Sequence, residues 1–581
     1  MSTSNTSDVA GRNALIQWKA AQPRNFFRAD PLLGGLLERS LGEADMAELR
    51  PRLERFGAQC ATELDPLVDA MEHRLALPRL ERWNGIGQRV EEVVYDERFH
   101  AAGRIIYGGG VISVLGERGG MTKAGGLAYL TNHTGEAGHN CPVACTAGIV
   151  KVLQNAASPE LRERFLPDVL TPDYARRLDG AQFLTEVQGG SDVGQNAVRA
   201  TPLADGTWRI DGEKWFCSNA SAALFLMTAR VTGPEERPGT GGLGLFLVRR
   251  TREDGSVNGF SIRRLKDKLG TRTMASGEMD FDGAIGWHMG PVGEGFHVVM
   301  NQVINTSRLY NAVGTLAMAR RAILVADGYA RHRVAFGRPI VQYPLVQQTL
   351  ADMSSEWAPL LAVTFALLDL RDRMERDEVD AIERSAFRVL VNVNKYRTAV
   401  SAGEIIRSGI EILGGNGAIE TFSPLPRLLR DNVVYENWEG THNTLVTQVH
   451  RDLGKLGLVA PLCTWLRETL ERAASASDGA LSGLARRTLS DVTVLEGQLA
   501  EVAATEPGLG TLRLRPLADR IGWLAGLACL ADQAAWELET RGATRWTPWL
   551  AHFHARRLAS PAVLPEATAL ASLAALTAES A

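Results

Sequence analysis

The sequence predicts an α+β protein that is mainly helical, with one β-rich stretch between two helical regions. From about residue 12 to 181 apolar side chains recur at spacings of three and four, as in LLERSLGEADMAELRPRLERFGAQ, which is the helical period. After Ala181 the pattern changes to short alternating runs such as WRIDGEKWFCS, separated by Gly, Asp and Asn, which indicate strands and turns. Helical spacing returns at about Gly295. We therefore expect a helical domain over 1–181, a β-domain over 182–290, a helical bundle over 291–457 and a helical extension over 458–581.

Proline and glycine mark the ends of several predicted helices. Asp30-Pro31 is typical of a helix boundary, because the residue before proline is biased away from helical geometry. In the third region we expect three long helices, which span Gly295–His332, begin at Leu345, and run from about Ala386 to Leu413. The last of these stops at Gly414-Gly415, a strong C-terminal signal.

Composition excludes several classes of protein. The chain has 581 residues, a formal net charge of −4 and 45% hydrophobic residues, which is ordinary for a soluble globular protein. Its six cysteines form no C-x-x-C pair, so we expect neither a disulfide scaffold nor a metal site. Dispersed thiols fit a reducing cytoplasm. The N-terminus does not resemble a signal peptide. The longest apolar run, Ile521–Ala531, is too short for a membrane span, which needs about 20 residues.

The first motif that could carry chemistry is the segment LTEVQGGSD, which starts at Leu184. It offers the hydroxyls of Thr185 and Ser191 and flexible backbone at Gly190. Loops of this kind can present N–H groups to a ring carbonyl or a phosphate. The alternative interpretation is an ordinary polar turn.

The second motif is the predicted strand KWFCSN, residues 214–219. Alternation places Phe216 and Ser218 on one face. An aromatic ring and a hydroxyl on the same face suit a flat heteroaromatic ligand with polar edges. The alternative is a strand that packs one aromatic side chain into the core.

Two further motifs lie at predicted helix ends. RVAFGRP, residues 333–339, follows a long helix, and ILGGNG, residues 412–417, ends another. Glycine at the second end allows another backbone or a phosphate to approach closely. For the first, the alternative is a basic cap followed by a Gly-Pro stop.

The fifth motif is YENWEGTHN, residues 435–443. Glu439 stands between Trp438 and Gly440. A carboxylate beside an aromatic ring can be desolvated, which raises its pKa and makes it a stronger base. The alternative is an exposed helix N-terminus in which Glu439 and Thr441 serve as capping residues.

In this order the five motifs resemble those of the acyl-CoA dehydrogenase superfamily, over about residues 70–455. That family has a helical domain, a middle β-domain and a four-helix domain, with FAD bound between them. The segments EAGHNCP (136–142) and RLKDKLGTRTMAS (264–276), together with the long C-terminal extension, are similar to the branch that contains the flavoprotein AidB.

The resemblance implies a role for each matching residue. Glu439 is the base that removes the α-proton of an acyl-CoA or related acyl thioester, while flavin N5 accepts the β-hydride and a trans-2-enoyl thioester forms. Residues in the family's FAD-contacting positions within one subunit are Leu184, Thr185, Gly190, Ser191, Phe216, Ser218, Thr441 and Asn443. Positions that contact the FAD of a neighbouring subunit are Arg333, Phe336, Gly414 and Gly415. Ser191, Arg308 and Gly440 match substrate positions. The family pattern also implies a homo-oligomer, a tetramer or dimer of dimers, and electron-transfer flavoprotein as the redox partner.

Two other functions are compatible with the motifs. An AidB-like protein could protect DNA and have little dehydrogenase activity, which would require a basic surface for phosphates. From Lys455 onward the chain carries 12 Lys and Arg against 13 Asp and Glu, so folding would have to cluster the basic side chains. The residues available for such a cluster are Arg486, Arg487, Arg513, Arg515, Arg556 and Arg557. A non-catalytic flavoprotein scaffold is the third possibility, against which the retained Glu439 argues. The near-neutral extension favours thioester oxidation, and nucleic acid is not an expected partner.

Overall fold

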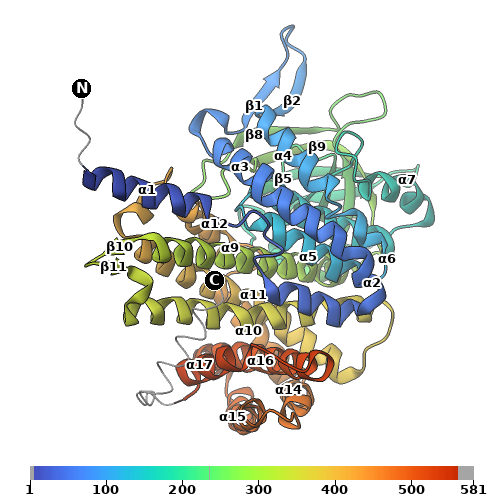
Figure 1. The fold of residues 1–581 in the computed structure, drawn as a ribbon. Coiled ribbons are helices and arrows are strands. Elements are labelled where there is room, and N and C mark those ends of the chain that lie inside the picture. Colours follow the sequence, from blue (N-terminus) through green and yellow to red (C-terminus); the bar gives the residue numbers. More distant parts are fainter. Residues whose placement is uncertain (1–5, 234–235, 560–581) are drawn as a thin grey trace, which may run out of the picture.

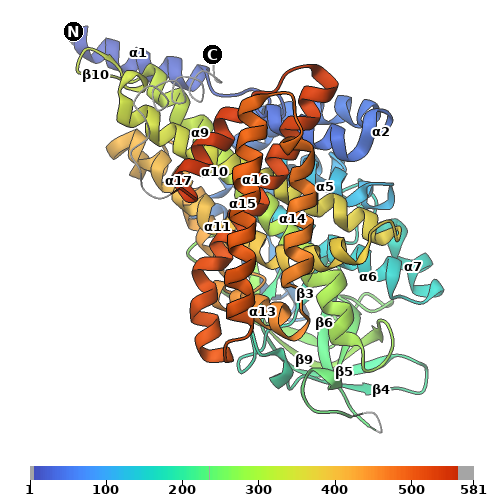
Figure 2. The same cartoon turned by 90° about the horizontal axis from the view of Figure 1, so that it is seen from below.

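The computed structural model describes residues 6–233 and 236–559, and Figures 1 and 2 show it from two directions. Its first region consists largely of helices. They are α1 (Thr6–Ala20), α2 (Pro31–Gln59), α3 (Asp65–Met71), α4 (Glu97–Gly108), α5 (Gly120–Asn132), α6 (Ala137–Asn155) and α7 (Pro159–Val169). Helix α2 begins at the predicted boundary, because the Asp30 side chain accepts hydrogen bonds from the backbone N–H groups of Leu32 and Leu33.

A β-hairpin, which was not expected from the sequence, interrupts this helical region. Strands β1 (Arg79–Trp83) and β2 (Arg89–Val94) pair antiparallel and extend from the body of the molecule (Figure 1). The signal was present at Asn84-Gly85, a dipeptide typical of hairpin turns. The flanking strands are rich in charge, so their alternation of apolar and polar residues is weak.

The middle region is a seven-stranded sheet. Its strands are β3 (Gly180–Phe183), β4 (Arg199–Pro202), β5 (Trp208–Ser218), β6 (Leu224–Val231), β7 (Leu243–Arg249), β8 (Phe260–Leu265) and β9 (Ser276–His288). The order is β3-β6-β4-β5-β9-β7, and β8 pairs with β9. Because β7 pairs with β6 as well as β9, the central strands close into a ring around their own apolar core.

Long helices return after the sheet. The elements are α8 (Gly295–Val298), α9 (Asn305–His332), β10 (Val334–Ala335), β11 (Arg338–Pro339), α10 (Pro344–Glu375), α11 (Ala381–Leu413), α12 (Leu425–Asn437) and α13 (His442–Lys455). The single helix expected over Gly295–His332 contains a π-helical segment, Val299–Ile304, between α8 and α9. A π segment adds a residue to the turn and is frequent at functional sites. It ends four residues before Arg308.

Four helices form the extension and lie against the bundle (Figure 2). They are α14 (Val459–Ala474), α15 (Gly479–Ala503), α16 (Pro507–Arg541) and α17 (Thr547–Arg557). Helices α16 and α17 pack on α10. Residues 560–581 of the predicted extension lie outside the described residues. Within the described ranges no helix is long and apolar enough to cross a membrane.

Candidate functional site

A cavity of about 740 Å³ lies where the helical region, the sheet and the bundle meet. Elements α6, β3, β5, α9 and the loop between α12 and α13 contribute to its wall. Of the residues singled out from the sequence, it is lined by Leu184, Thr185, Gly190, Ser191, Phe216, Ser218, Arg308, Glu439, Gly440 and Thr441. Segments more than 250 positions apart in the chain therefore form one site.

A buried ion pair joins the first two motifs. Lys214 Nζ lies 2.7 Å from Glu186 Oε1, and both side chains are buried. Glu186 also accepts a hydrogen bond from the backbone N–H of Ala197, at 2.6 Å. The backbone N–H of Trp215 donates to the carbonyl of Thr185 at 3.0 Å. These bonds fix the glycine-containing loop against strand β5, and Thr185 and Ser218 line the same cavity.

The wall made by β5 fits a flat ring with polar edges. Phe216 is 50% exposed, which is unusual for a large apolar side chain on a strand whose neighbour Cys217 is fully buried. The hydroxyls of Thr185 and Ser218 form no hydrogen bond to other side chains in the described ranges, although both line the cavity. Available hydroxyls beside an uncovered aromatic ring are what a heteroaromatic cofactor requires.

The loop that carries Glu439 has an unusual backbone. Glu439 has φ +58° and Gly440 has φ +105°, a region that residues with a side chain rarely adopt. Two cations fix this conformation. Arg308 Nε donates to the carbonyl of Glu439 at 3.1 Å, and Lys395 Nζ donates to the carbonyl of Gly440 at 3.0 Å. A Cβ on Gly440 would also lie 3.2 Å from Leu445. The loop thus needs glycine at this position for its backbone as well as for space.

The electrostatics of Glu439 follow from this arrangement. Arg308 and Lys395 give hydrogen bonds to backbone oxygens, and in the described part of the chain no group donates one to the Glu439 carboxylate. Burial raises the pKa of Glu439 to about 7, and the charges of Arg308 and Lys395 oppose that rise. A pKa near 7 suits a general base at neutral pH. The same burial lowers the pKa of Lys395 to about 7.

The capping alternative for this segment is wrong. Thr441 occupies the N-cap position of α13, but its side chain caps no backbone N–H. Its hydroxyl lies 3.0 Å from that of Thr444. Glu439 lines the cavity instead of the helix end.

Three residues at the site were not predicted from the sequence. Thr444 links Ser191 to Thr441, since its hydroxyl is also 3.1 Å from Ser191 Oγ. Gln448 accepts a hydrogen bond from Arg308 Nη2 at 3.0 Å. Thr444 and Gln448 lie one helical turn apart on α13, so helical period from Thr441 could have suggested them. Lys395 stands in the middle of α11 with no local signal.

Five predicted cofactor residues lie outside the cavity. Four of them gather where α9 and α11 end, on the hairpin β10–β11 and the turn after α11. These are Arg333, Phe336, Gly414 and Gly415, all of them exposed. Phe336 is 98% exposed. Asn443, the fifth, accepts a hydrogen bond from Arg515 of α16 at 2.9 Å and turns away from the cavity.

Fold and site together define a class of protein in which helices, a closed sheet and a helical bundle surround a cavity. That cavity is lined by the Glu439 carboxylate, whose pKa burial raises to about 7. Family models match the three regions in order. They are the adaptive response protein AidB N-terminal domain over residues 17–176, the acyl-CoA dehydrogenase middle domain over 181–284 and the acyl-CoA dehydrogenase C-terminal domain over 293–454.

Individual relatives give the same result. Acyl-CoA dehydrogenase family member 11 of Caenorhabditis elegans is 32% identical over 437 residues, which cover 74% of this chain and 70% of the relative. The putative acyl-CoA dehydrogenase AidB of Escherichia coli is 33% identical over 389 residues, covering 65% and 69%. The crystal structure of C. elegans ACDH-11 in complex with C11-CoA has a TM-score of 0.83 at 27% identity, covering 93% of this chain and 92% of that one.

The chain belongs to the acyl-CoA dehydrogenase family, in its AidB-like branch, and is an oxidoreductase. The predicted fold class and family are confirmed. The described ranges contain no group of three or more His, Cys, Asp and Glu side chains that could hold a metal ion.

Proposed function

We propose that the protein dehydrogenates an acyl-CoA to the trans-2-enoyl thioester, with Glu439 as the base and FAD as the hydride acceptor. The observation that carries this proposal is the state of Glu439. Its carboxylate lines the shared cavity, lacks hydrogen-bond donors in the described ranges, and has a pKa raised to about 7 by burial.

The loop that contains Glu439 supplies two functions for removal of the α-proton, a base and a hydrogen-bond donor to the thioester carbonyl. An α-C–H is a weak acid, so its removal needs a desolvated base and a polarised thioester carbonyl. Glu439 supplies the base. Because Arg308 and Lys395 hold the carbonyls of Glu439 and Gly440, the loop backbone is fixed with the Glu439 N–H free to donate to a thioester oxygen. Such preorganised donors stabilise charge that develops in the transition state.

FAD, the cofactor of this family, supplies the hydride acceptor that no side chain can provide. Thr185, Ser218 and the uncovered face of Phe216 would hold its ring, consistent with their unused hydroxyls and exposure. The exposed group at the ends of α9 and α11 would contact the FAD of another subunit. We therefore infer a homo-oligomer, a tetramer or dimer of dimers.

The substrate is inferred to be a CoA thioester. The solved C. elegans relative is a complex with C11-CoA, and the present chain matches that protein over nearly its full length. Acyl groups on a carrier protein are the alternative thioester. Electron-transfer flavoprotein is proposed as the acceptor that reoxidises the flavin, on the basis of the family pattern.

Anaerobic titration of the purified flavoprotein with acyl-CoAs of graded length and branching tests the proposal. We expect loss of the oxidised-flavin absorbance with at least one acyl-CoA, and no such loss when Glu439→Gln is titrated. The matched control is Glu436→Gln, one turn earlier and outside the cavity lining. Full reduction of the Glu439→Gln flavin would remove Glu439 as the base, and no reduction by any thioester would remove the activity.

The DNA-associated alternative has less support. Of the six arginines that could have clustered in the extension, Arg556 and Arg557 both contact the buried Glu356 and so face the bundle. Arg513 pairs with Glu501 at 3.4 Å. These contacts remove half of the proposed cluster from a free basic surface.

A further inference from the structure

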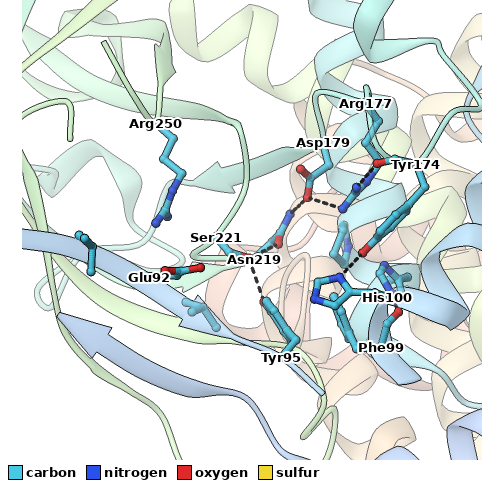
Figure 3. Close-up of a pocket in the computed structure, with 14 residues that line it drawn as sticks. Glu92, Tyr95, Phe99, His100, Tyr174, Arg177, Asp179, Asn219, Ser221 and Arg250 are labelled. Atoms are coloured by element: carbon cyan, nitrogen blue, oxygen red, sulfur yellow. Dashed lines mark hydrogen bonds and ion pairs between the residues drawn. The ribbon is translucent and has the colours of Figure 1, made fainter. Parts of the chain in front are cut away.

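A second cavity, of about 340 Å³, lies at the junction of the hairpin, helix α4 and the sheet (Figure 3). Its wall comes from β2, the start of α4, the first turns of α6, the segment before β3, the turn after β5 and the end of β7. It shares no lining residue with the cavity that contains Glu439. The function proposed above makes no use of it.

One side of this pocket is a fixed aromatic wall. The Phe99 ring stacks between Tyr95, with ring centroids 3.9 Å apart, and His139, at 4.0 Å. Tyr95 is anchored by a 2.9 Å contact between its hydroxyl and Ser221 Oγ. A flat apolar group entering the pocket would therefore meet rings that are already immobilised.

Tyr174 and His100 continue this wall (Figure 3). The Tyr174 hydroxyl lies 3.0 Å from Nδ1 of His100. The guanidinium of Arg177 lies 3.7 Å above the centre of the Tyr174 ring and 4.0 Å from Asp179. Asp179 also accepts a hydrogen bond from Asn219 at 2.9 Å. Arg177 thus packs on the ring of Tyr174, and Asp179 holds Asn219 in the wall.

The opposite side of the pocket carries two opposite charges, Arg250 and Glu92, which form no ion pair with each other in the described ranges. Arg250 donates to the backbone carbonyls of Glu91 and Ala220, at 2.5 and 3.3 Å, and no carboxylate in the described ranges lies within 4.0 Å of it. Glu92 has no ion pair or hydrogen bond through its carboxylate in the same ranges. It is exposed, and it stands directly opposite Glu81 in the hairpin. Like charges facing each other across two strands are unfavourable.

This combination matches a zwitterion better than a simple ion. A ligand with a carboxylate alone would approach Glu92 as well as Arg250, and an amine alone would approach Arg250 as well as Glu92. A molecule with both groups on one carbon can place its carboxylate on the guanidinium, because the two backbone carbonyls use only two of its five N–H groups. Its ammonium can then lie against Glu92, which lines the same cavity.

The rest of the pocket fixes the class of side chain. A volume of about 340 Å³ is near the lower end for small-molecule sites, enough for an amino acid with a ring. The rings of Tyr95, His100 and Tyr174 face the two charges across the pocket (Figure 3). We propose that this second cavity is a binding site for a free aromatic α-amino acid.

Calorimetric titration of the full-length flavoprotein with L-phenylalanine, L-tyrosine and L-tryptophan tests the proposal. We expect saturable binding of at least one of them. The analogues 3-phenylpropionate, which lacks the ammonium, and phenethylamine, which lacks the carboxylate, should bind at least about tenfold more weakly than L-phenylalanine or the best of the three, because each leaves one charge unpaired. Equal binding of either analogue would overturn the zwitterion assignment, and no binding of the three amino acids would overturn the site.

Two variants place the ligand in this pocket. Glu92→Gln should weaken the amino acid at least about tenfold and leave 3-phenylpropionate unweakened, since an exposed residue can be changed without unfolding the chain. Arg250→Gln should weaken both. The control Glu48→Gln, an exposed carboxylate on α2, should bind like the wild type. Unchanged affinity in Glu92→Gln, or loss of binding in Glu439→Gln, would show that the amino acid binds elsewhere.

Discussion

Two carboxylates with cationic neighbours behave in opposite ways, and the difference separates the site from the scaffold. Glu356 on α10 is 1% exposed and accepts from Arg557 Nε at 2.8 Å, Arg556 Nη1 at 2.9 Å and Ser401 Oγ at 2.7 Å. Burial acts to raise the pKa of Glu356, but Arg557 and the other arginines outweigh it and lower that pKa.

Glu439 also has two cations nearby, yet the pKa of Glu439 is raised to about 7, with burial as the largest cause. What differs is the target of the hydrogen bonds. Arg308 and Lys395 donate to backbone carbonyls of the loop. Their charges therefore act on the Glu439 carboxylate, but neither side chain donates a hydrogen bond to it. A carboxylate saturated with donors joins the extension to the bundle, whereas one deprived of donors is available as a base.

The strongest test of this contrast exchanges each carboxylate for its amide. Glu439→Gln should lower the rate of flavin reduction by an acyl-CoA by at least about 10³-fold, because general-base catalysis is lost. FAD content should stay unchanged. Glu356→Gln should retain the rate per folded molecule. Stopped-flow absorbance of both variants measures this, and comparable losses in the two would contradict the division between base and scaffold.

Stability should respond in the reverse order. Glu356→Gln leaves Arg397, Arg556 and Arg557 without their buried counter-charge, and we expect the free energy of unfolding to fall by about 3 kcal/mol. Because the pKa of Glu356 is lowered in the folded state, its contribution is present above the unfolded pKa and is lost as pH falls. Denaturant unfolding at several pH values provides the measurement.

The control for that experiment is Glu404→Gln. Glu404 pairs with Arg557 at 3.1 Å but is 45% exposed, so its loss should cost less than about 1 kcal/mol. Equal costs for the two variants would mean that the extension is not held by the buried carboxylate.

Glu439 should also destabilise the fold in a pH-dependent way. Its folded-state pKa of about 7 is above the ordinary value for a glutamate, so the folded state binds a proton that the unfolded state releases. Stability therefore falls as pH rises toward and through 7. Glu439→Gln should be more stable than the wild type by about 2 kcal/mol at pH 8 and by much less at pH 4.5. Chemical unfolding at both pH values tests this, with Glu48→Gln as the control, and a pH-independent difference would refute it.

Local signals predicted the fold class and singled out Glu439 as the candidate base. Helical spacing and alternation predicted the mainly helical α+β class, and Gly414-Gly415 marked the end of α11, because each signal is a property of neighbouring residues. Glu439 was identified from its motif, and the structure places it in the cavity with Thr185, Phe216 and Ser218. The roles of the remaining cofactor residues stay predictions.

What the sequence could not predict depends on distant contacts. Lys395 reaches the loop of Glu439 and Gly440 from 45 positions away, and nothing around it in α11 marks a buried cation. The pocket beside Arg250 is built from six segments, each of which has the local pattern of an ordinary helix, turn or strand. The π segment before Arg308 has no local signal in the sequence either. The hairpin is different, because the sequence contains a turn signal for it at Asn84-Gly85. The helical pattern of the flanking segments led to a helical prediction instead.

The smallest expected effect tests whether Lys395 tunes the base or only holds the loop. In the wild type the rate of flavin reduction should rise as pH passes about 7, when Glu439 loses its proton. Removing a nearby cation disfavours the ionised carboxylate, so Lys395→Gln should move this rise to higher pH, by less than about one unit because the pKa of Lys395 is itself lowered to about 7 and its charge fades over the same range.

Stopped-flow rates across this pH range measure the shift, with the exposed Lys455→Gln as the control. A lower rate with an unmoved midpoint would mean that Lys395 acts on the Gly440 carbonyl alone. In that case the pKa of Glu439 would be set by burial, which raises it, and by Arg308, which lowers it. The contrast with Glu356 would then reduce to the number of donors that each carboxylate receives.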